Sequence, residues 1–204
     1  MDAGRHGWPK PSAVMTFENG DPDENPWVAG KPVQEDIRIE NYSPEWPACF
    51  ETSRRIIAEV LPGIALHIEH VGSTAVPMLA AKPVIDIDLI VSDPDREDGY
   101  IPRLTASGYV LTVRERSWYQ HRMLRYGHPR INLHVFGPEC PEHFRHVLFR
   151  DWLCDHPEDR ARYTAAKEEA KISVANAYDY NMKKQKTVRE IYHKIFVSRG
   201  WSVG

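Results

Sequence analysis

Residues 70–91 read HVGSTAVPMLAAKPVIDIDLIV, the end of one apolar strand, a Gly-Ser turn and a second strand that carries two aspartates. Residues two apart in a strand point to the same face, so Asp86 and Asp88 are expected side by side. Neighbouring carboxylates repel each other unless a cation relieves the repulsion. Mg²⁺ binds one or two carboxylates together with water and phosphate oxygens. The pair therefore predicts a Mg²⁺ site, which Mn²⁺ would also fit; the alternative is an edge strand whose aspartates face water.

Gly72 and Ser73, directly after the first strand, indicate a phosphate-binding turn. Glycine lets a phosphate approach the backbone, and the Ser73 hydroxyl with the following backbone N–H groups, that of Thr74 included, can hold it. A short helical stretch just downstream adds the positive potential of a helix N-terminus. A phosphate cradle at one strand end beside two acids on the next strand is more specific than either feature alone.

Outside this stretch, strand patterns dominate the first part of the chain and helical patterns the second, which predicts an α+β fold. Ser43 and Pro44 are typical of a helix start. Alternating apolar residues indicate strands, and apolar residues three or four apart indicate helices. The predicted strands are 67–71, 84–91, 109–113, 121–126 and 131–136; the predicted helices start near Ser43, span 95–107 before Gly108, and fill the chain from Pro141 to its end.

Residues 1–35 differ from the rest, because they are rich in Gly, Pro, Asp and Asn and show no periodicity. Such a composition is typical of a flexible extension. Trp8, Phe17 and Trp27 leave a second interpretation, a strap that packs its aromatic side chains on the domain. We expect the folded domain to span residues 36–198, beginning with a short extended piece at Ile37.

The bulk composition is that of one globular domain: 204 residues, 42% of them apolar, with a net charge of −3. The slight acidic excess argues against a nucleic-acid binder. No apolar run approaches the roughly 18 residues that a membrane span requires. The 3 cysteines lack paired spacing, and no hydrophobic signal segment begins the chain. These features favour a reducing compartment, so we expect a cytoplasmic protein.

The stretch 70–91 resembles the signature of GrpB-like proteins, a family of the nucleotidyltransferase superfamily. The resemblance covers roughly residues 36–196. Residues 42–46 resemble the opening motif of the family, and residues 132–135 resemble its histidine-containing strand. Residues 149–153 resemble its Phe-Arg-Asp motif. Tyr180 and Lys184 resemble a Tyr/Lys pair in its last helix.

This resemblance implies a nucleotidyltransferase-like mixed β-sheet flanked by helices, with a helical C-terminal part. It also implies that Gly72 and Ser73 contact nucleotide phosphates and that Asp86 and Asp88 hold Mg²⁺. GrpB-like modules are found fused to some bacterial dephospho-CoA kinases as well, where they accompany another enzyme.

Three positions depart from the pattern of the superfamily or family. Superfamily enzymes usually add a third carboxylate from a nearby strand, whereas strand 131–136 offers His134, which can act as a general base near pH 7. With two carboxylates only, one metal ion is favoured over two. Met78 stands where the family usually has glycine, and Asn132 stands where it commonly has histidine.

Basic residues supply further candidates for ligand contact. Arg122 or Arg125, in the basic segment 121–130, could clamp a phosphate with two N–H donors; Arg122 is the preferred candidate, and a solvated hairpin is an equal alternative. Lys82 and Lys184 are candidates for the same role. The alternative for each is an ordinary solvent-exposed lysine without a ligand contact. A zinc site at Cys140, His143, His146 and Cys154 is disfavoured, because two histidines at this spacing on a polar helix are more often solvated.

Three functions remain open at this stage. The leading hypothesis is an enzyme that uses Mg²⁺ to transfer a nucleotidyl or related group to a small-molecule acceptor, with Asp86, Asp88 and His134 as catalytic residues. Tyr180 and Lys184 would then contact the ligand, a nucleotide or pyrophosphate. The second hypothesis is a fold reused as a cyclase, isomerase or lyase of specialised metabolism that does not use NTP. The third is a non-catalytic module that binds a nucleotide or a partner protein.

Overall fold

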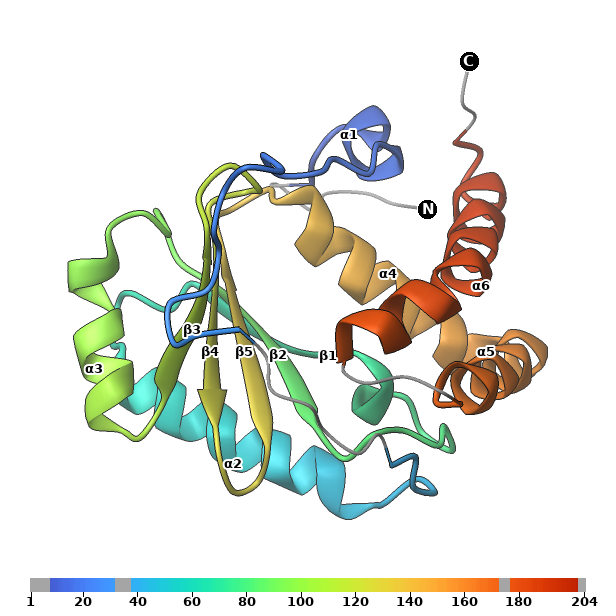
Figure 1. Ribbon diagram of the computed structural model, residues 1–204, viewed down its shortest axis with the longest axis horizontal. Coiled ribbons are helices and arrows are strands. Elements are labelled where there is room, and N and C mark those ends of the chain that lie inside the picture. The colour runs from blue at the N-terminus through green and yellow to red at the C-terminus, as the bar shows by residue number, and fades with distance from the viewer. Residues whose placement is uncertain (1–7, 32–37, 173–176, 202–204) are drawn as a thin grey trace.

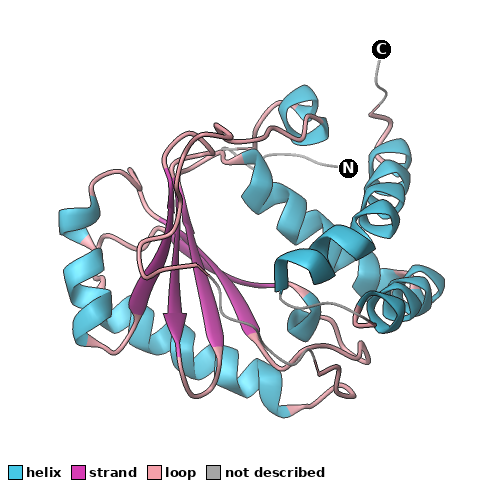
Figure 2. Cartoon of the chain, in the orientation of Figure 1, coloured by secondary structure: helices cyan, strands magenta, loops and turns pink. Residues whose placement is uncertain are grey.

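The computed structural model describes residues 8–31, 38–172 and 177–201. At its centre lies a mixed sheet with strand order β1-β2-β5-β4-β3 (Figures 1 and 2). β2 and β5 are parallel, and the other neighbouring strands are antiparallel. The strands are β1 (His67–Val71), β2 (Ile85–Ile90), β3 (Val110–Glu115), β4 (His121–Tyr126) and β5 (Ile131–Phe136). The predicted α+β fold with a mixed sheet is confirmed.

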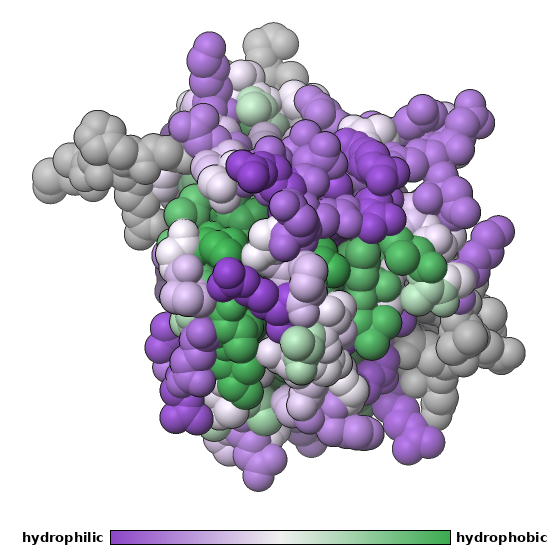
Figure 3. All heavy atoms as spheres, turned by 90° about the vertical axis from the view of Figure 1, so that its left-hand side faces the viewer, coloured by the Kyte–Doolittle hydropathy of each residue, from purple (hydrophilic) through white to green (hydrophobic). Residues whose placement is uncertain are grey.

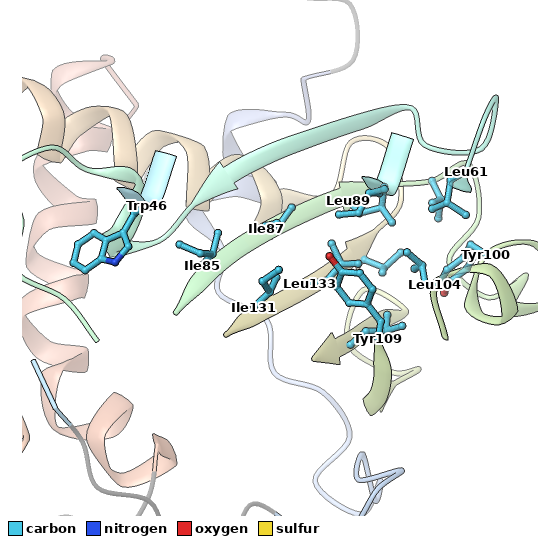
Figure 4. Packing of buried hydrophobic residues seen from close by; sticks show 14 of the residues in the cluster. Trp46, Leu61, Ile85, Ile87, Leu89, Tyr100, Leu104, Tyr109, Ile131 and Leu133 are labelled. Carbon is cyan, nitrogen blue, oxygen red and sulfur yellow. The ribbon is translucent and has the colours of Figure 1, made fainter. Parts of the chain in front are cut away.

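One face of the sheet packs on α2 (Glu45–Val60) and α3 (Ile101–Ala106). Ile85, Ile87 and Leu89 of β2 point to this face and are buried with Trp46 of α2 (Figure 4). Full burial of each such aliphatic side chain stabilises the fold by roughly 1.5–3 kcal/mol. A slip of β2 by one residue would bring its aspartates into this core instead, so the apolar residues set the register. The aspartates consequently point to the opposite face.

Helices α4 (Pro141–Asp155), α5 (Pro157–Ala170) and α6 (Ala177–Ser198) lie on the other side of the sheet from α3 (Figure 1). They form a second core with the short helix α1 (Pro11–Met15) and with Val76 and Leu79, which follow the Gly-Ser turn. The predicted helical C-terminal part is thus confirmed. Its position matters for function, because it encloses the face of the sheet that carries the aspartates.

The predicted helix over 95–107 is wrong in its extent. The chain instead forms a 3₁₀ turn at Glu97–Gly99 and then α3, and Gly108 follows with a φ of 93°. Pro102 explains the later start, since proline lacks an N–H group and is accommodated in the first turn of a helix. The stretch after Gly72 is likewise a single 3₁₀ turn, Ser73–Ala75, rather than a longer helix.

Residues 8–31, called the strap below, pack along the domain. Val14 is fully buried, and the buried guanidinium of Arg145 donates hydrogen bonds of 2.9 Å to the carbonyl oxygens of Val14 and Thr16. Trp8 packs on Phe144 of α4, with ring centroids 4.6 Å apart. The described part of the N-terminal extension therefore follows the strap interpretation. Residues 1–7 and 32–37, including the predicted start at Ile37, lie outside the described residues.

The surface on the α3 side shows apolar side chains between polar ones (Figure 3). A cavity of about 430 Å³ lies between α2 and the end of β4 with the turn that follows it, with Cys49, Ile56 and Tyr126 in its lining. All 3 cysteines, Cys49, Cys140 and Cys154, carry free thiols. Among the helices of the described residues, none combines the length and apolar character that crossing a membrane requires.

Met78 adopts a φ of 65°, and its side chain is 77% exposed. The left-handed conformation costs a non-glycine residue roughly 1–2 kcal/mol, and this side chain recovers little by burial. We expect Met78→Gly to raise the free energy of unfolding by about 0.5–1 kcal/mol, measured by urea denaturation. Met78→Ala is the matched control, because it keeps the strained backbone and should bring no gain. A Met78→Gly protein no more stable than wild type would contradict this prediction.

Candidate functional site

A cleft of about 570 Å³ lies between the face of the sheet that carries the aspartates and residues of α5 and α6. Its floor consists of side chains from β2, β5, β4 and β3. The Gly72-Ser73 turn borders the floor beside β2, and Pro26 and Trp27 of the strap contribute to the lining as well. Acidic, imidazole, amine and apolar side chains therefore meet in one cavity.

The register of the sheet arranges the side chains on this face in two rows. In the first row Asp86 of β2 lies opposite Asn132 of β5, and Asn132 lies opposite Arg125 of β4. In the second row Asp88 lies opposite His134. Residues directly opposite each other on neighbouring strands share a face. Alternate residues of β2, β5 and β4 therefore point to the same face of the sheet.

Asp86 is the aspartate that faces the cleft. Its Oδ1 accepts a hydrogen bond of 2.9 Å from Nδ2 of Asn132, and its side chain is 30% exposed. Burial acts to raise the pKa of this carboxyl, but the nearby His134 and the hydrogen bond from Asn132 outweigh it and hold the pKa below its usual value. Gly72 packs so closely that a Cβ there would lie 2.5 Å from Asp86 Oδ2. Asp86 is therefore an anion held beside the turn.

Asp88 is fully buried and held by two histidines of α4. Its Oδ2 lies 2.9 Å from Nδ1 of His143 and 3.0 Å from Nδ1 of His146. Burial acts to raise the Asp88 pKa, but the charge of His146 and the hydrogen bonds from both imidazoles lower it far below its usual value. Burial opposes a charge on His146 too, yet Asp88 and Glu142 raise its pKa well above the ordinary value. Asp88 thus serves as the buried counterion of α4.

A chain of three side chains leads from β3 to Asp86. Burial lowers the pKa of His121 to about 4, so its ring is neutral at pH 7. Its Nδ1 donates to Oε2 of Glu115 at 2.7 Å, which leaves Nε2 as an acceptor. His134 must then donate from Nδ1 across the 3.0 Å contact. In the neutral form of the His134 ring, Nε2, which lies 3.9 Å from Oδ1 of Asp86, is then the nitrogen available as a base or a ligand atom.

Two lysines form a positive wall opposite this floor. The ammonium of Lys184 on α6 lies 4.7 Å from the ring centroid of Tyr180 and 3.3 Å from the hydroxyl of Tyr163. Lys167 on α5 is buried and donates to the carbonyl oxygen of Ala80. Burial, with the charge of Lys184, lowers the pKa of Lys167 to about 7. The cleft thus combines the carboxylates of Asp86 and Glu115 with the basic side chains of Arg125 and Lys184, which suits a ligand that carries phosphates.

The structure brings together most, but not all, of the predicted site residues. Arg122 points to the opposite face, where its guanidinium binds Glu97 at 2.7 Å and Asp95 at 2.6 Å. Thr74 is buried, and its hydroxyl donates to the carbonyl oxygen of Val84 at 3.1 Å. Arg122, Thr74 and Asp88 are therefore placed outside the cleft. The predicted residues that line it are Gly72, Ser73, Lys82, Asp86, His134, Tyr180 and Lys184.

Several lining residues were missed or ranked second by sequence reasoning. Arg125, the second choice after Arg122, alternates with it on β4, so the pattern separates the two faces without indicating which one meets the cleft. His146 and Lys167 lie on helices and give no local signal, because long-range packing brings them to the sheet. Trp27 was noted only as an aromatic residue of the extension. Glu115 and His121 also line the cleft.

The donor set at Asp86 fits one magnesium ion. Mg²⁺ needs one or two carboxylates and fills the remaining positions with water and phosphate oxygens. Asp86 offers a carboxylate and His134 an imidazole nitrogen, whereas both Asp88 oxygens already have imidazole partners. Within residues 8–31, 38–172 and 177–201, no three His, Cys, Asp or Glu side chains form a ready metal cage. The disfavoured zinc site gains no support, since two of its ligands bind Asp88.

Comparison with known proteins identifies relatives of this chain. The UPF0157 protein BH1888 of Halalkalibacterium halodurans is 44% identical over 137 residues, covering 67% of this chain and 70% of that protein. A dephospho-CoA kinase of Mycolicibacterium paratuberculosis is 30% identical over 199 residues, covering 81% of this chain but 48% of that protein. The crystal structure of the conserved protein GrpB from Enterococcus faecalis matches with a TM-score of 0.65 and 27% identity, covering 78% of this chain and 99% of that one.

The strap lies outside the region that defines the family, since the profile described as GrpB protein matches residues 36–194. The matched region contains the whole sheet, the Gly-Ser turn and the two aspartates. On this match, the chain belongs to the GrpB family.

Proposed function

We propose that this GrpB-family chain is a Mg²⁺-dependent enzyme that transfers a nucleotidyl or related phosphate-containing group to a small-molecule acceptor. The observation that carries the proposal is Asp86, an accessible anion between the Gly72-Ser73 turn and Nε2 of His134. A phosphate binder, a metal-binding carboxylate and a base are the groups that such a transfer requires.

Each part of the site has a task in this reaction. The Gly72-Ser73 turn would bind a phosphate through its backbone N–H groups and the Ser73 hydroxyl. Asp86 would hold Mg²⁺, which when bound neutralises charge on the phosphates. His134 Nε2 would accept the proton of the acceptor hydroxyl as its oxygen bonds to phosphorus and pyrophosphate leaves. Lys184, on the opposite wall, would stabilise the negative charge of the leaving group.

Asp86→Asn is expected to lower the rate of pyrophosphate release by more than the 10- to 100-fold that loss of an outer metal contact typically costs, because Asp86 would bind the cation directly. The assay supplies each of the four NTPs with Mg²⁺ and a panel of hydroxyl and amine acceptors. Glu59→Gln is the matched control, since it removes one carboxylate from an exposed position of α2. Absence of both binding and turnover with all four NTPs would contradict the proposal.

The arrangement of Asp88 favours a second candidate, an enzyme that binds a pyrophosphate-bearing metabolite and acts as a cyclase, isomerase or lyase without NTP. With Asp88 paired to histidines, Asp86 is the one aspartate of β2 that faces the cleft. Activity would then depend more strongly on His134 than on Ser73. Binding of pyrophosphate together with failure of every NTP to bind would favour this candidate over nucleotidyl transfer. Thermal stabilisation by a nucleotide without any turnover would instead indicate a binding module.

A further inference from the structure

Trp27 of the strap extends one row of the cleft floor beyond the sheet. It pairs with Val113 of β3 in an antiparallel bridge, Val113 lies opposite Met123 of β4, and Met123 lies opposite His134. Directly opposed residues share a face, so these four side chains stand in line. The row runs from the imidazole of His134, near Asp86, to the indole of Trp27 in the strap.

Backbone hydrogen bonds hold Trp27 in this place. The N–H of Val28 donates to the carbonyl oxygen of Thr112 at 3.1 Å, and the N–H of Arg114 donates to the carbonyl oxygen of Pro26 at 2.8 Å. Upstream, the carboxylate of Glu24 accepts from the N–H of Arg116 at 2.7 Å and of Ser117 at 3.0 Å. Trp27 is therefore part of a fixed wall of the cleft, and its side chain is only partly buried.

The two ends of the cleft differ in chemistry. Asp86, His134 and Lys184 lie at one end, whereas Trp27, Val113 and Met123 form an apolar group at the other end, bordered by the charged side chains of Glu115 and Arg125. Neighbouring strands lie about 4.8 Å apart, so three steps separate the Trp27 backbone from that of His134 by about 14 Å. A ligand with phosphates at the Gly-Ser turn would reach the apolar end with its non-phosphate part.

We propose that Trp27, Val113 and Met123 form the binding pocket for a planar heteroaromatic ring of the nucleobase class. An indole offers a flat face for stacking, Met123 offers an adaptable thioether contact, and Val113 closes the floor. Because Trp27 lies outside the family-matched region 36–194, the strap supplies ligand selectivity that the family domain alone lacks. This proposal rests on the proposed function only in assuming that the ligand also carries phosphates.

The test measures binding by isothermal titration to the full chain in the presence of Mg²⁺. The probes are the four NTPs, the four nucleosides, inorganic pyrophosphate and geranyl diphosphate. We expect at least one NTP to bind wild type more tightly than pyrophosphate does. Trp27→Ala should weaken that NTP about 5- to 150-fold, the effect of losing one stacked base. Its affinity for pyrophosphate should stay within about twofold, and Trp27→Phe should restore most of the NTP affinity.

Trp8→Ala is the matched control, because Trp8 lies in the same strap but packs on Phe144. It should lower the melting temperature without changing the preference for NTP over pyrophosphate. Equal weakening of NTP and pyrophosphate by Trp27→Ala, or no weakening of either, would overturn the ring pocket. Tighter binding of geranyl diphosphate than of any NTP would overturn it as well, in favour of an alkyl chain.

Failure of the proposed function has a different signature. If pyrophosphate and every NTP fail to bind wild type, the phosphate half is wrong. Nucleoside binding that Trp27→Ala abolishes would then still support the ring pocket. Absence of binding by all nucleosides and all nucleotides would overturn the ring pocket together with the phosphate site.

Discussion

Asp88→Ala should lower the free energy of unfolding by about 3–5 kcal/mol, the cost of removing one partner from a buried ion pair. The change would leave His146, whose pKa Asp88 and Glu142 raise, in a partly buried position with one counterion lost. It would also remove the acceptor that lies 2.9 Å from Nδ1 of His143. Both imidazoles belong to α4, so the contact between this helix and β2 should weaken.

The measurement is urea denaturation at pH 7, with Asp86→Ala as the comparison. Asp86 is partly exposed and accepts one side-chain hydrogen bond from Asn132, so its replacement should cost no more than about 1.5 kcal/mol. The two aspartates, two residues apart on one strand, would thus separate into a structural and a ligand-facing residue. Equal losses of stability in the two variants would show that this division is wrong.

Gly72→Ala should lower both stability and ligand binding. Gly72 has φ 70° and ψ −169°, a conformation that is essentially restricted to glycine and costs other residues about 1–3 kcal/mol. An added Cβ would lie 2.5 Å from Oδ2 and 3.0 Å from Cβ of Asp86, so the carboxylate must move. We expect the variant to lose Mg²⁺-dependent binding or turnover to the same degree as Asp86→Asn.

Gly63→Ala separates the strain from the displacement of Asp86. Gly63 also has a positive φ, 71°, but a Cβ there would meet no atom within 4 Å. This control should lose about 1–2 kcal/mol of stability and keep ligand binding unchanged. Denaturation and titration of both variants with Mg²⁺ and pyrophosphate give the comparison. Full ligand binding by Gly72→Ala would contradict the close contact between the turn and the carboxylate.

Local patterns in the sequence were sufficient for the strands and for the position of Asp86. Strands β4 and β5 match their predicted bounds, because alternating apolar residues carry the signal. The Gly-Ser turn was found for the same reason, since a glycine at a strand end is a local feature. The helix over 95–107 was predicted too long because Pro102 was compatible with it in sequence but starts α3 in the fold.

The role of Asp88 could not be predicted from local sequence. The spacing of two residues correctly placed it on the face of Asp86, but the partners that occupy it, His143 and His146, lie 55 and 58 residues away. Their spacing on a polar helix suggested solvent exposure. Arg122 and Arg125 show the same limit, since alternation divides them between two faces and only the packed helices decide which face holds the cleft.

The strap also affects the outer edge of the sheet. β3 is an edge strand in the order of the sheet, and such strands present unpaired N–H and C=O groups to which a strand of another molecule can add. Pro26 and Val28 occupy backbone groups of Arg114 and Thr112 at this edge. Detachment of the strap would therefore open the cleft and also expose the unpaired backbone groups of β3. Because another molecule could pair with these groups, the strap residues that bind them should also reduce aggregation.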